Sequence, residues 1–259
     1  MRLIWKQKDI EEDLDFILFL QQDDKPAWWS KRLFEVFPSL NYEYARKLSE
    51  SERLKYIRKE MEKLSVLHSD DIQNSIKMFQ KNWAPVEKKL NQAYSSTFGV
   101  DCTKILNDMV GFVGLDPVCP RNVQEHTFDV FYRFDPEYAV STALHEITHF
   151  VWFCIWHEHF KDNPDEYDSP NLKWVLSEIV VETIIRNSEI GNLIKQPKYI
   201  AYSYFYDMTI NGNLLFDTMK KLYLERKNIY DFMEKAYKFV QQNEPELRKK
   251  IDEAESKTY

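Results

Sequence analysis

Cysteine is scarce in this sequence. The three cysteines, Cys102, Cys119 and Cys154, contain no Cys-x-x-Cys pair in a chain of 259 residues. An odd and sparse set excludes a disulfide framework and is typical of proteins in a reducing compartment. We therefore expect three buried thiols in a cytoplasmic protein.

Long apolar runs and basic runs are also missing. The longest apolar runs, Phe16–Leu20 and Phe150–Trp156, are far shorter than the roughly 20 residues that a membrane-spanning helix needs. An acidic stretch, 9–15, follows the two positive charges near the start, so we expect no signal peptide. The formal charge is -7, and no basic run could follow a phosphate backbone. We expect neither a membrane nor a nucleic acid as partner.

Glycine is rare, and its distribution divides the chain. Only five glycines occur, and three of them lie between residues 97 and 114. Before this point, apolar residues recur three and four positions apart, as they do on one face of a helix. We predict a helical N-terminal region over 1–96, a core with short strands over 97–210 and a helical C-terminal region over 211–259, packed as one compact unit. The prolines expected to separate the first helices are Pro26, Pro38 and Pro85.

Two short segments rich in Val and Phe are predicted to be strands. They are Met109–Leu115 and Thr127–Phe134, and we expect them to pair antiparallel. The second strand leads through Pro136 into a helical stretch that ends near His159. The fold class that we predict is α+β, mostly helical, with a small β-sheet beside this helix.

The rest of the chain is predicted to be helical. A polar loop follows His159, and a second strongly apolar helix runs from Leu172 to about Ile190. Two facing helices joined by a loop are therefore expected. The tail should form two or three more helices, with breaks near Asn228 and at Pro245.

The motif that carries chemistry is His145-Glu146-Ile147-Thr148-His149, an H-E-x-x-H pattern inside the first of these helices. At a spacing of four residues both imidazoles project from one helix face and can hold a single ion. Zinc favours neutral imidazole nitrogen, and a catalytic zinc site uses three protein ligands with the fourth position left for water. Glu146 lies beside the histidine stripe, where it is the natural general base. The alternative is a surface helix, which the apolar flanks of the motif argue against.

The third ligand must come from elsewhere in the chain. A histidine six residues after the motif is excluded, because Ile155 occupies that position. His157 lies about 12 Å along the helix from His149, so we assign His157 and His159 a structural or surface role. Two acids remain in the second apolar helix, four residues apart and on one stripe: Glu178 and Glu182. Two carboxylates on a buried helix need a cation or hydrogen-bond donors.

From His145 to Glu182 the sequence resembles the gluzincins, the thermolysin-like superfamily in which H-E-x-x-H is completed by a glutamate from a later helix. The resemblance implies a zincin-like catalytic core and a zinc-dependent metallopeptidase with a peptide or protein substrate. It implies that Glu178 binds Zn²⁺ and that Glu182 accepts a hydrogen bond from one ligand histidine. The reverse assignment, with Glu182 as ligand and Glu178 as support, is the alternative. Ser177 stands where thermolysin has asparagine.

The resemblance also implies a hydrogen-bond donor for the oxyanion that forms on the substrate carbonyl. It further implies a strand edge along which the substrate lies. No histidine follows His159, and the richest later source of donors is a tyrosine cluster from which we select Tyr206 and Tyr202. The cluster could equally pack at the edge of a core. Arg186 could contact substrate or pair with a neighbouring acid. The strand Thr127–Phe134 takes the place along which an extended substrate would lie, although its aromatic residues could instead be core.

Two other functions remain open. The protein could hydrolyse a non-peptide amide with Cys119 or Cys102 as third ligand, as deformylases use an upstream cysteine. It could also keep a metal for structure and bind a partner through its helical surface, in which case a fourth protein ligand should close the site. The sequence leaves the oligomeric state open.

Overall fold

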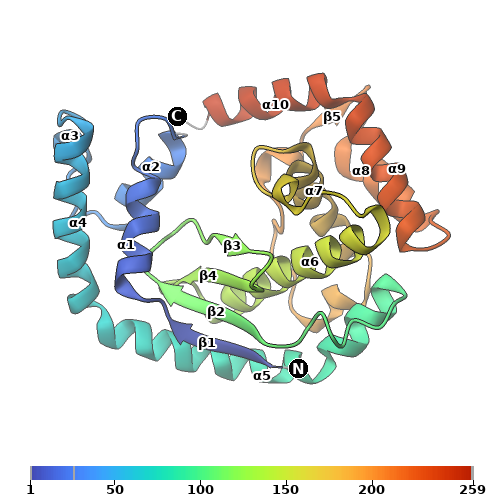
Figure 1. Cartoon of the computed structure of the whole chain (residues 1–259), viewed down its shortest axis with the longest axis horizontal. Helices are drawn as coiled ribbons and strands as arrows, with labels where there is room; N and C mark the ends of the chain where they lie inside the picture. Colours follow the sequence, from blue (N-terminus) through green and yellow to red (C-terminus); the bar gives the residue numbers. More distant parts are fainter. Residues whose placement is uncertain (1, 26, 258–259) are drawn as a thin grey trace. The chain divides into compact units, whose positions relative to one another are not determined.

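The computed structural model describes residues 2–25 and 27–257; Met1, Pro26, Thr258 and Tyr259, which include one of the predicted helix breaks, lie outside these ranges. As predicted, the fold is α+β and mostly helical, with a small sheet (Figure 1). Within the described ranges, no helix combines the length and the apolar character that crossing a membrane would require.

The described residues form two compact units. The first contains residues 2–3, 83–109 and 140–257, and the second contains residues 4–82 and 110–139. These boundaries cut across the three regions predicted from the sequence, because the long helix and the strands connect distant stretches of the chain. The H-E-x-x-H motif and the later acidic helix both belong to the first unit.

The second unit contains most of the N-terminal helices. They are α1 (Ile10–Phe19), α2 (Ala27–Val36), α3 (Tyr42–Ala45), α4 (Glu50–Leu67) and the beginning of α5 (Ser69–Phe98). Ser49 and Glu52 form a capping box at the start of α4. Pro38 follows the end of α2, as predicted.

Pro85 does not separate helices, contrary to the sequence prediction. Helix α5 continues through it, from Ser69 to Phe98. Pro85 has no N–H, so the carbonyl group four residues earlier, on Lys81, loses its helical partner. Both residues are exposed, and water can satisfy this carbonyl. An exposed position therefore tolerates the proline.

The larger sheet has four strands in the order β1-β2-β4-β3. They are β1 (Leu3–Gln7), β2 (Met109–Gly114), β3 (Arg121–Asn122) and β4 (Thr127–Phe131). The predicted antiparallel pairing of the second and fourth strands is wrong: β2 and β4 run parallel, with Val110 opposite Thr127 and Gly114 opposite Phe131. The connection between them spans about a dozen residues, long enough for a parallel crossover.

Strand β4 is not an edge of this sheet, so the predicted substrate edge is also corrected. Strand β3 pairs antiparallel with the first half of β4, and the carbonyl of Pro120 accepts the N–H of Asp129 at 2.8 Å. The aromatic side chains of Phe128, Phe131 and Tyr132 are buried. They therefore belong to the core, which was the second interpretation of these residues.

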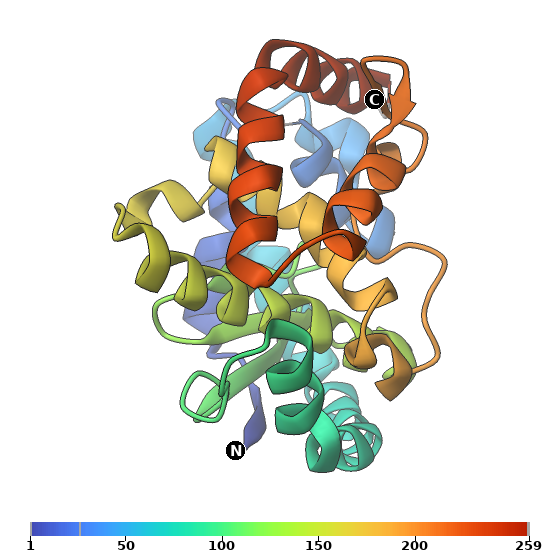
Figure 2. The same cartoon turned by 90° about the vertical axis from the view of Figure 1, so that its right-hand side faces the viewer.

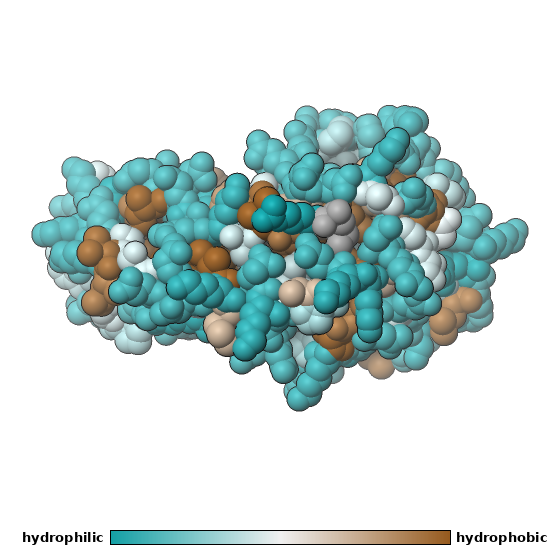
Figure 3. Space-filling view, turned by 90° about the horizontal axis from the view of Figure 1, so that it is seen from below, coloured by the Kyte–Doolittle hydropathy of each residue, from teal (hydrophilic) through white to brown (hydrophobic). Residues whose placement is uncertain are grey.

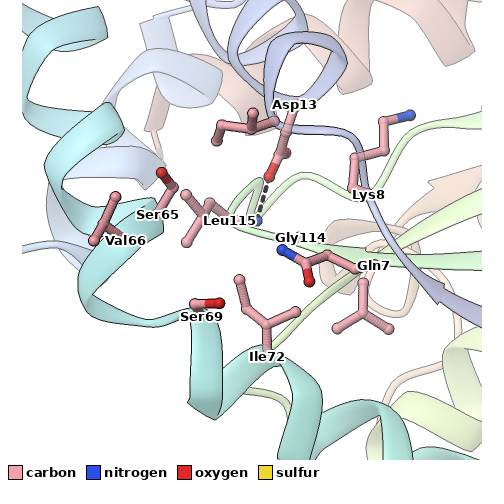
Figure 4. A pocket seen from close by; sticks show the side chains of 11 residues that line it. Gln7, Lys8, Asp13, Ser65, Val66, Ser69, Ile72, Gly114 and Leu115 are labelled. Carbon is pink, nitrogen blue, oxygen red and sulfur yellow. Dashed lines mark hydrogen bonds between the residues drawn. The ribbon is translucent and has the colours of Figure 1, made fainter.

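Three buried aspartates surround the ends of β2 and α1. Asp13, Asp116 and Asp129 are only 3%, 2% and 6% exposed. The carboxylate of Asp13 accepts the N–H of Leu115 at 2.6 Å, as Figure 4 shows, and that of Asp116 at 3.2 Å. A Cβ on Gly114 would stand 2.6 Å from Asp13 Oδ2, so only glycine allows this approach. A pocket of about 280 Å³ beside Asp13 gives water a route to this carboxyl (Figure 4).

The charges of these aspartates are only partly compensated. Lys8 Nζ lies 3.3 Å from Asp129 Oδ2 and 3.6 Å from Glu12. Asp116 Oδ1 accepts the N–H of Val118 at 3.1 Å, but within the described residues its buried Oδ2 has no hydrogen-bond partner. Burial is therefore the main influence on ionisation: it raises the pKa of Asp13 to about 6, that of Asp129 to about 7 and that of Asp116 well above its usual value.

We predict that these aspartates make the folded state less stable as the pH rises from about 4 to about 7. Their folded pKa values lie above the value of 3.8 for an unperturbed aspartate, so the folded protein holds protons that the unfolded chain has released. This stabilisation is present near pH 4 and is lost as the pH rises through about 6 to 7. Urea unfolding at several pH values measures it. Asp116→Asn should flatten the dependence, whereas the exposed control Asp252→Asn should leave it unchanged; an equal slope in Asp116→Asn would contradict the prediction.

The first unit contains the remaining helices and a two-stranded sheet (Figure 2). They are α6 (Pro136–Phe160), η1 (Pro164–Tyr167), α7 (Leu172–Arg186), η2 (Glu189–Leu193), η3 (Ser203–Phe205), β5 (Thr209–Ile210), β6 (Asn213–Leu214), α8 (Leu215–Leu224), α9 (Ile229–Gln242) and α10 (Glu244–Lys257). Helices α8, α9 and α10 and the break near Asn228 match the prediction. The second break lies at Asn243 and not at Pro245, which is the second residue of α10. Helices α8 and α9 pack against α7 and against each other, so α7 is buried from Val175 to Ile185.

The exposed surface agrees with the sequence composition. On the face drawn in Figure 3, hydrophilic side chains predominate and hydrophobic ones occur in small scattered groups. Cys102 is buried, as predicted, whereas Cys119 and Cys154 are half-buried.

Candidate metal centre

Helix α6 brings the two motif histidines together. It begins at Pro136, whose fixed φ suits the first turn, and the side chain of Asp135 caps it by accepting the N–H of Glu137 at 2.9 Å. His145 and His149 lie one turn apart on the same face, and their Nε2 atoms are 3.0 Å from each other. The predicted projection from one face is therefore confirmed.

Helix α7 supplies the carboxylate that approaches both histidines. Glu178 Oε2 lies 3.4 Å from His145 Nε2, and Glu178 Oε1 lies 3.5 Å from His149 Nε2. The side chain of Glu178 is 3% exposed and that of His149 is fully buried. His145 is the most exposed of the three, at 14%, so solvent reaches the cluster on its side.

Two carboxylates lie near the histidines, and their positions differ. A carboxylate oxygen of Glu146 groups with both imidazoles within 4.8 Å, and Glu146 Oε1 lies 3.9 Å from His145 Nε2. Glu178 Oε2 lies closer to that nitrogen, at 3.4 Å, and Glu178 Oε1 lies 3.5 Å from His149 Nε2. A third ligand has to reach the same point as the two nitrogens, so the distances favour Glu178 for that role and leave Glu146 beside it.

The donor set fits a small divalent metal. Ligand bonds of about 2.0–2.1 Å in a tetrahedron place two nitrogens roughly 3.3 Å apart, close to the separation of the two Nε2 atoms. Two imidazoles and one carboxylate are the ligands of known catalytic zinc sites. His145, His149 and Glu178 could therefore hold zinc with little movement. Within the described residues the cluster contains no cysteine.

Glu182 has other partners than the predicted one. Its carboxylate accepts hydrogen bonds from Arg186 Nε and from the hydroxyl of Tyr206, the latter at 2.5 Å. A bond from a ligand histidine is not among the hydrogen bonds of Glu182 in the described part of the chain. Glu182 is 4% exposed, so these two donors compensate an otherwise buried charge. Arg186 pairs with Glu182, which is one of the alternatives predicted for it.

The two predicted tyrosines lie in different surroundings. The hydroxyl of Tyr206 donates to Glu182 and accepts the N–H of Ile200 at 2.8 Å. Burial, and then the bond to Glu182, raise the pKa of Tyr206. Tyr202 lies at the start of η3, where its ring is 6.1 Å from that of Trp174 on α7. Tyr206 is therefore committed to a positioning bond, whereas Tyr202 touches the metal-site helix through its ring.

Tyr94 is a positioning residue that the sequence did not reveal. It lies on the part of α5 that belongs to the first unit, and its buried hydroxyl contacts α6 just before and within the motif. It donates to the carbonyl of Leu144 at 2.9 Å and lies 2.8 Å from Thr148 Oγ1. Burial raises the pKa of Tyr94 far above its usual range, so the hydroxyl remains neutral. No motif marks such a residue, because its role depends on tertiary packing.

Tyr94→Phe should lower the free energy of unfolding by about 1–2 kcal/mol, because it removes a buried hydroxyl and leaves Thr148 with one partner fewer. The ring is retained, so the packing loss is small. Urea unfolding of the variant measures the effect. Tyr237→Phe, a half-buried tyrosine on α9, serves as the control and should change stability by less. Equal unfolding free energies for Tyr94→Phe and the wild type would show that the hydroxyl does not stabilise α6.

A second set of contacts fixes His149 and the loop between the two helices. The ring of Phe153 stacks near His149 and against Tyr167, with centroid distances of 6.3 and 4.3 Å. The hydroxyl of Tyr167 donates to Asp162 at 2.6 Å, and Lys173 at the start of α7 pairs with the same carboxylate at 2.5 Å. These contacts tie the loop 161–171 to both helices and so hold the two ligand-bearing helices together.

The other histidines near the motif stand apart from the cluster, as predicted. His157 lies 3.4 Å from the Tyr167 hydroxyl, and His159 lies 2.8 Å from Glu234 on α9. Both have local partners near the end of α6.

Comparison of the chain with protein-family models, with curated proteins and with solved structures found no match.

Proposed function

We propose that this protein is a zinc-dependent metallopeptidase of the gluzincin type, with a zincin-like catalytic region. The observation that carries the proposal is the convergence of His145 Nε2, His149 Nε2 and the Glu178 carboxylate, within 3.0–3.5 Å of one another and from two helices, with Glu146 beside them. This combination matches the ligands and the base that hydrolysis of an amide by activated water requires.

His145, His149 and Glu178 would hold the metal. When bound there, zinc supplies a Lewis acid for the substrate carbonyl and lowers the pKa of water. The three ligands come from two buried helices that Tyr94 and the loop contacts hold in place. A site held in this way retains its geometry during catalysis.

Glu146 is the proposed general base and acid. It accepts a proton from the attacking water and returns that proton to the leaving nitrogen of the peptide bond. The residue is 6% exposed, so few water molecules compete for its carboxylate. Its position beside the ligands, rather than between them, suits a group that handles protons.

Tyr202 and Tyr206 are the two proposed donors for a contact with the reacting carbonyl. Tyr206 would have to give up its bond to Glu182 before its hydroxyl could donate to an oxyanion. Peptide or protein substrates remain the proposed partners. A third ligand from cysteine, as in an enzyme for non-peptide amides, has no support from the described cluster.

A second candidate function follows from the position of Glu146. Because a Glu146 oxygen groups with both imidazoles within 4.8 Å, it could close the site as a fourth protein ligand. The metal would then be structural, and the helical surface would serve to bind a partner. Catalysis would be absent in that case.

Elemental analysis of the purified wild type, combined with cleavage of a mixed peptide library, tests the proposed function. One zinc per chain together with cleavage that a chelator abolishes and zinc restores is the expected result. Stoichiometric zinc without cleavage would favour the closed structural site. A protein that binds no zinc after incubation with the metal would remove both functions.

A further inference from the structure

The cavity of about 280 Å³ in the second unit lies where strands β1 and β2 end (Figure 4). The ends of these strands are adjacent, because the N–H of Lys8 donates to the carbonyl of Val113 at 3.0 Å. The other walls come from the first turn of α1 and from the junction between α4 and α5. In sheets with parallel strands, small molecules commonly bind outside the carboxyl ends of the strands. The position of the cavity is therefore one that suits a ligand.

Asp13 is the only acidic side chain among the described residues that line this cavity. It is 3% exposed, and its two oxygens accept one N–H each, from Leu115 and from Asp116. An ionised carboxylate has about four positions for hydrogen bonds. Two positions on this buried carboxylate are therefore unused by the described residues.

The nearby ammonium group of Lys8 does not pair with Asp13. It lies 3.3 Å from Asp129 and 3.6 Å from Glu12, and Figure 4 shows it directed away from the cavity. Burial and, to a lesser degree, the charge of Asp13 raise the pKa values of Asp116 and Asp129. A cation beside Asp13 would offset this excess of negative charge.

Apolar side chains form much of the remaining wall. Ile72, Val113 and Leu115 line the cavity and are at most 3% exposed, whereas Val66 is 80% exposed and lies at its opening. The amide of Gln7 and the hydroxyl of Ser69 point toward the same space in Figure 4. The cavity thus combines one buried carboxylate with an apolar wall and a polar rim.

The volume and the donor set limit the class of ligand. An apolar cavity of about 150 Å³ holds benzene, so this one has room for roughly ten non-hydrogen atoms. A metal ion would find too few ligands, because in the described ranges the motif cluster is the one group of three side chains that could bind one. The chemistry therefore points to an organic cation.

We propose that this cavity binds a small primary amine with a short apolar body, whose ammonium group donates to Asp13 while the body lies against Ile72 and Leu115. Hydrogen bonds between an ammonium group and a carboxylate are about twice as strong as neutral ones. A carboxylate ligand is excluded, because it would be repelled by Asp13. The inference is independent of the proposed function, since these residues belong to the second unit and the metal cluster belongs to the first.

Three compounds of nearly equal size test the recognition of charge: 2-phenylethylamine, 2-phenylethanol and phenylacetate. They are titrated into the wild type by calorimetry at a pH of about 8, where an aliphatic amine is still protonated. The pKa of Asp13 is about 6, so its carboxyl group is ionised under these conditions. The amine should bind saturably, with an affinity at least about 10-fold higher than that of the alcohol. Phenylacetate should not bind.

Two variants with matched controls locate the site. Asp13→Asn should reduce the affinity for the amine to that for the alcohol, whereas Asp15→Asn, at an exposed acid on the same helix, should keep the preference. Ser65→Leu places a larger side chain in the cavity and leaves Asp13 intact, so it should abolish binding of the amine. Ser51→Leu, at an exposed serine on the same helix as Ser65, should bind normally.

Equal affinities of the wild type for the amine and the alcohol would overturn the proposal, as would the absence of saturable binding. Unchanged binding in Ser65→Leu would place the amine elsewhere and would overturn it too. These two results decide the question even if Asp13→Asn does not fold. Glu178→Ala, which alters the proposed metal site, should bind the amine as the wild type does. Loss of amine binding in that variant would assign the amine to the metal centre and remove this site.

Discussion

Glu146→Gln should lower kcat for peptide cleavage by about 10²- to 10⁴-fold while the protein keeps its zinc. The substitution preserves the size of the side chain and removes its ability to take a proton. The residue is only 6% exposed, so bulk water cannot easily replace it as the base. Rates with a cleavable peptide and zinc content by elemental analysis, both on the same sample, measure the two halves of this prediction.

The same variant separates the two candidate functions. If Glu146 were a fourth protein ligand, its replacement by glutamine would weaken zinc binding, and the wild type would show no activity to lose. Glu158→Gln, a change at an exposed acid on the same helix, is the matched control and should alter neither rate nor zinc content. A fully active Glu146→Gln variant would refute the role of Glu146 as the base.

The convergence of the two motif histidines could be predicted from the sequence because helical periodicity converts spacing into position. Four residues between His145 and His149 place both side chains on one face, whatever the rest of the fold does. That an acid of the second helix approaches them required one more step, that two buried helices face each other, and the apolar character of the second helix indicated it. The choice of Glu178 over Glu182 came from the resemblance to the gluzincins. The structure places its carboxylate within 3.5 Å of both imidazoles.

The sheet could not be predicted to the same depth. The segments that became β2 and β4 were recognisable as strands, but strand direction depends on the path of the chain between them. The intervening residues fold back to add β3 at the edge of β4. A hairpin and a crossover of this length look alike in sequence, so the predicted antiparallel pairing was wrong. The predicted substrate-binding edge at β4 was wrong as well, because β3 covers part of that strand.

The surroundings of Glu182 show another limit. The sequence pattern places an acid one turn after the ligand, yet its partners come from Arg186 on the same helix and from Tyr206, 24 residues away. The first of these is a local i, i+4 pair and was among the alternatives. The second depends on the course of the chain between α7 and Tyr206, as the role of Tyr94 depends on the course of α5. Hydrogen bonds of this kind leave no signal in residue spacing.

Substitutions at three acids of the first unit, Glu178, Glu182 and Glu189, test directly which carboxylate holds the proposed metal. Glu178→Ala should reduce zinc affinity by more than about 100-fold, since it removes a ligand, whereas loss of an outer partner typically costs 10- to 100-fold. The wild-type geometry supports this order, because Glu178 is the carboxylate within 3.5 Å of both histidines. Competition with a chelator of known affinity measures the change in each variant.

Glu182→Ala provides the critical comparison. It should retain zinc with a smaller loss than Glu178→Ala, because its hydrogen bonds go to Arg186 and Tyr206. Its main effect should be a lower free energy of unfolding, because Arg186 and Tyr206 lose the buried carboxylate that they both contact. Glu189→Ala, at an exposed acid just beyond α7, should change neither quantity. A larger zinc loss in Glu182→Ala than in Glu178→Ala would reverse the assignment and make Glu182 the ligand.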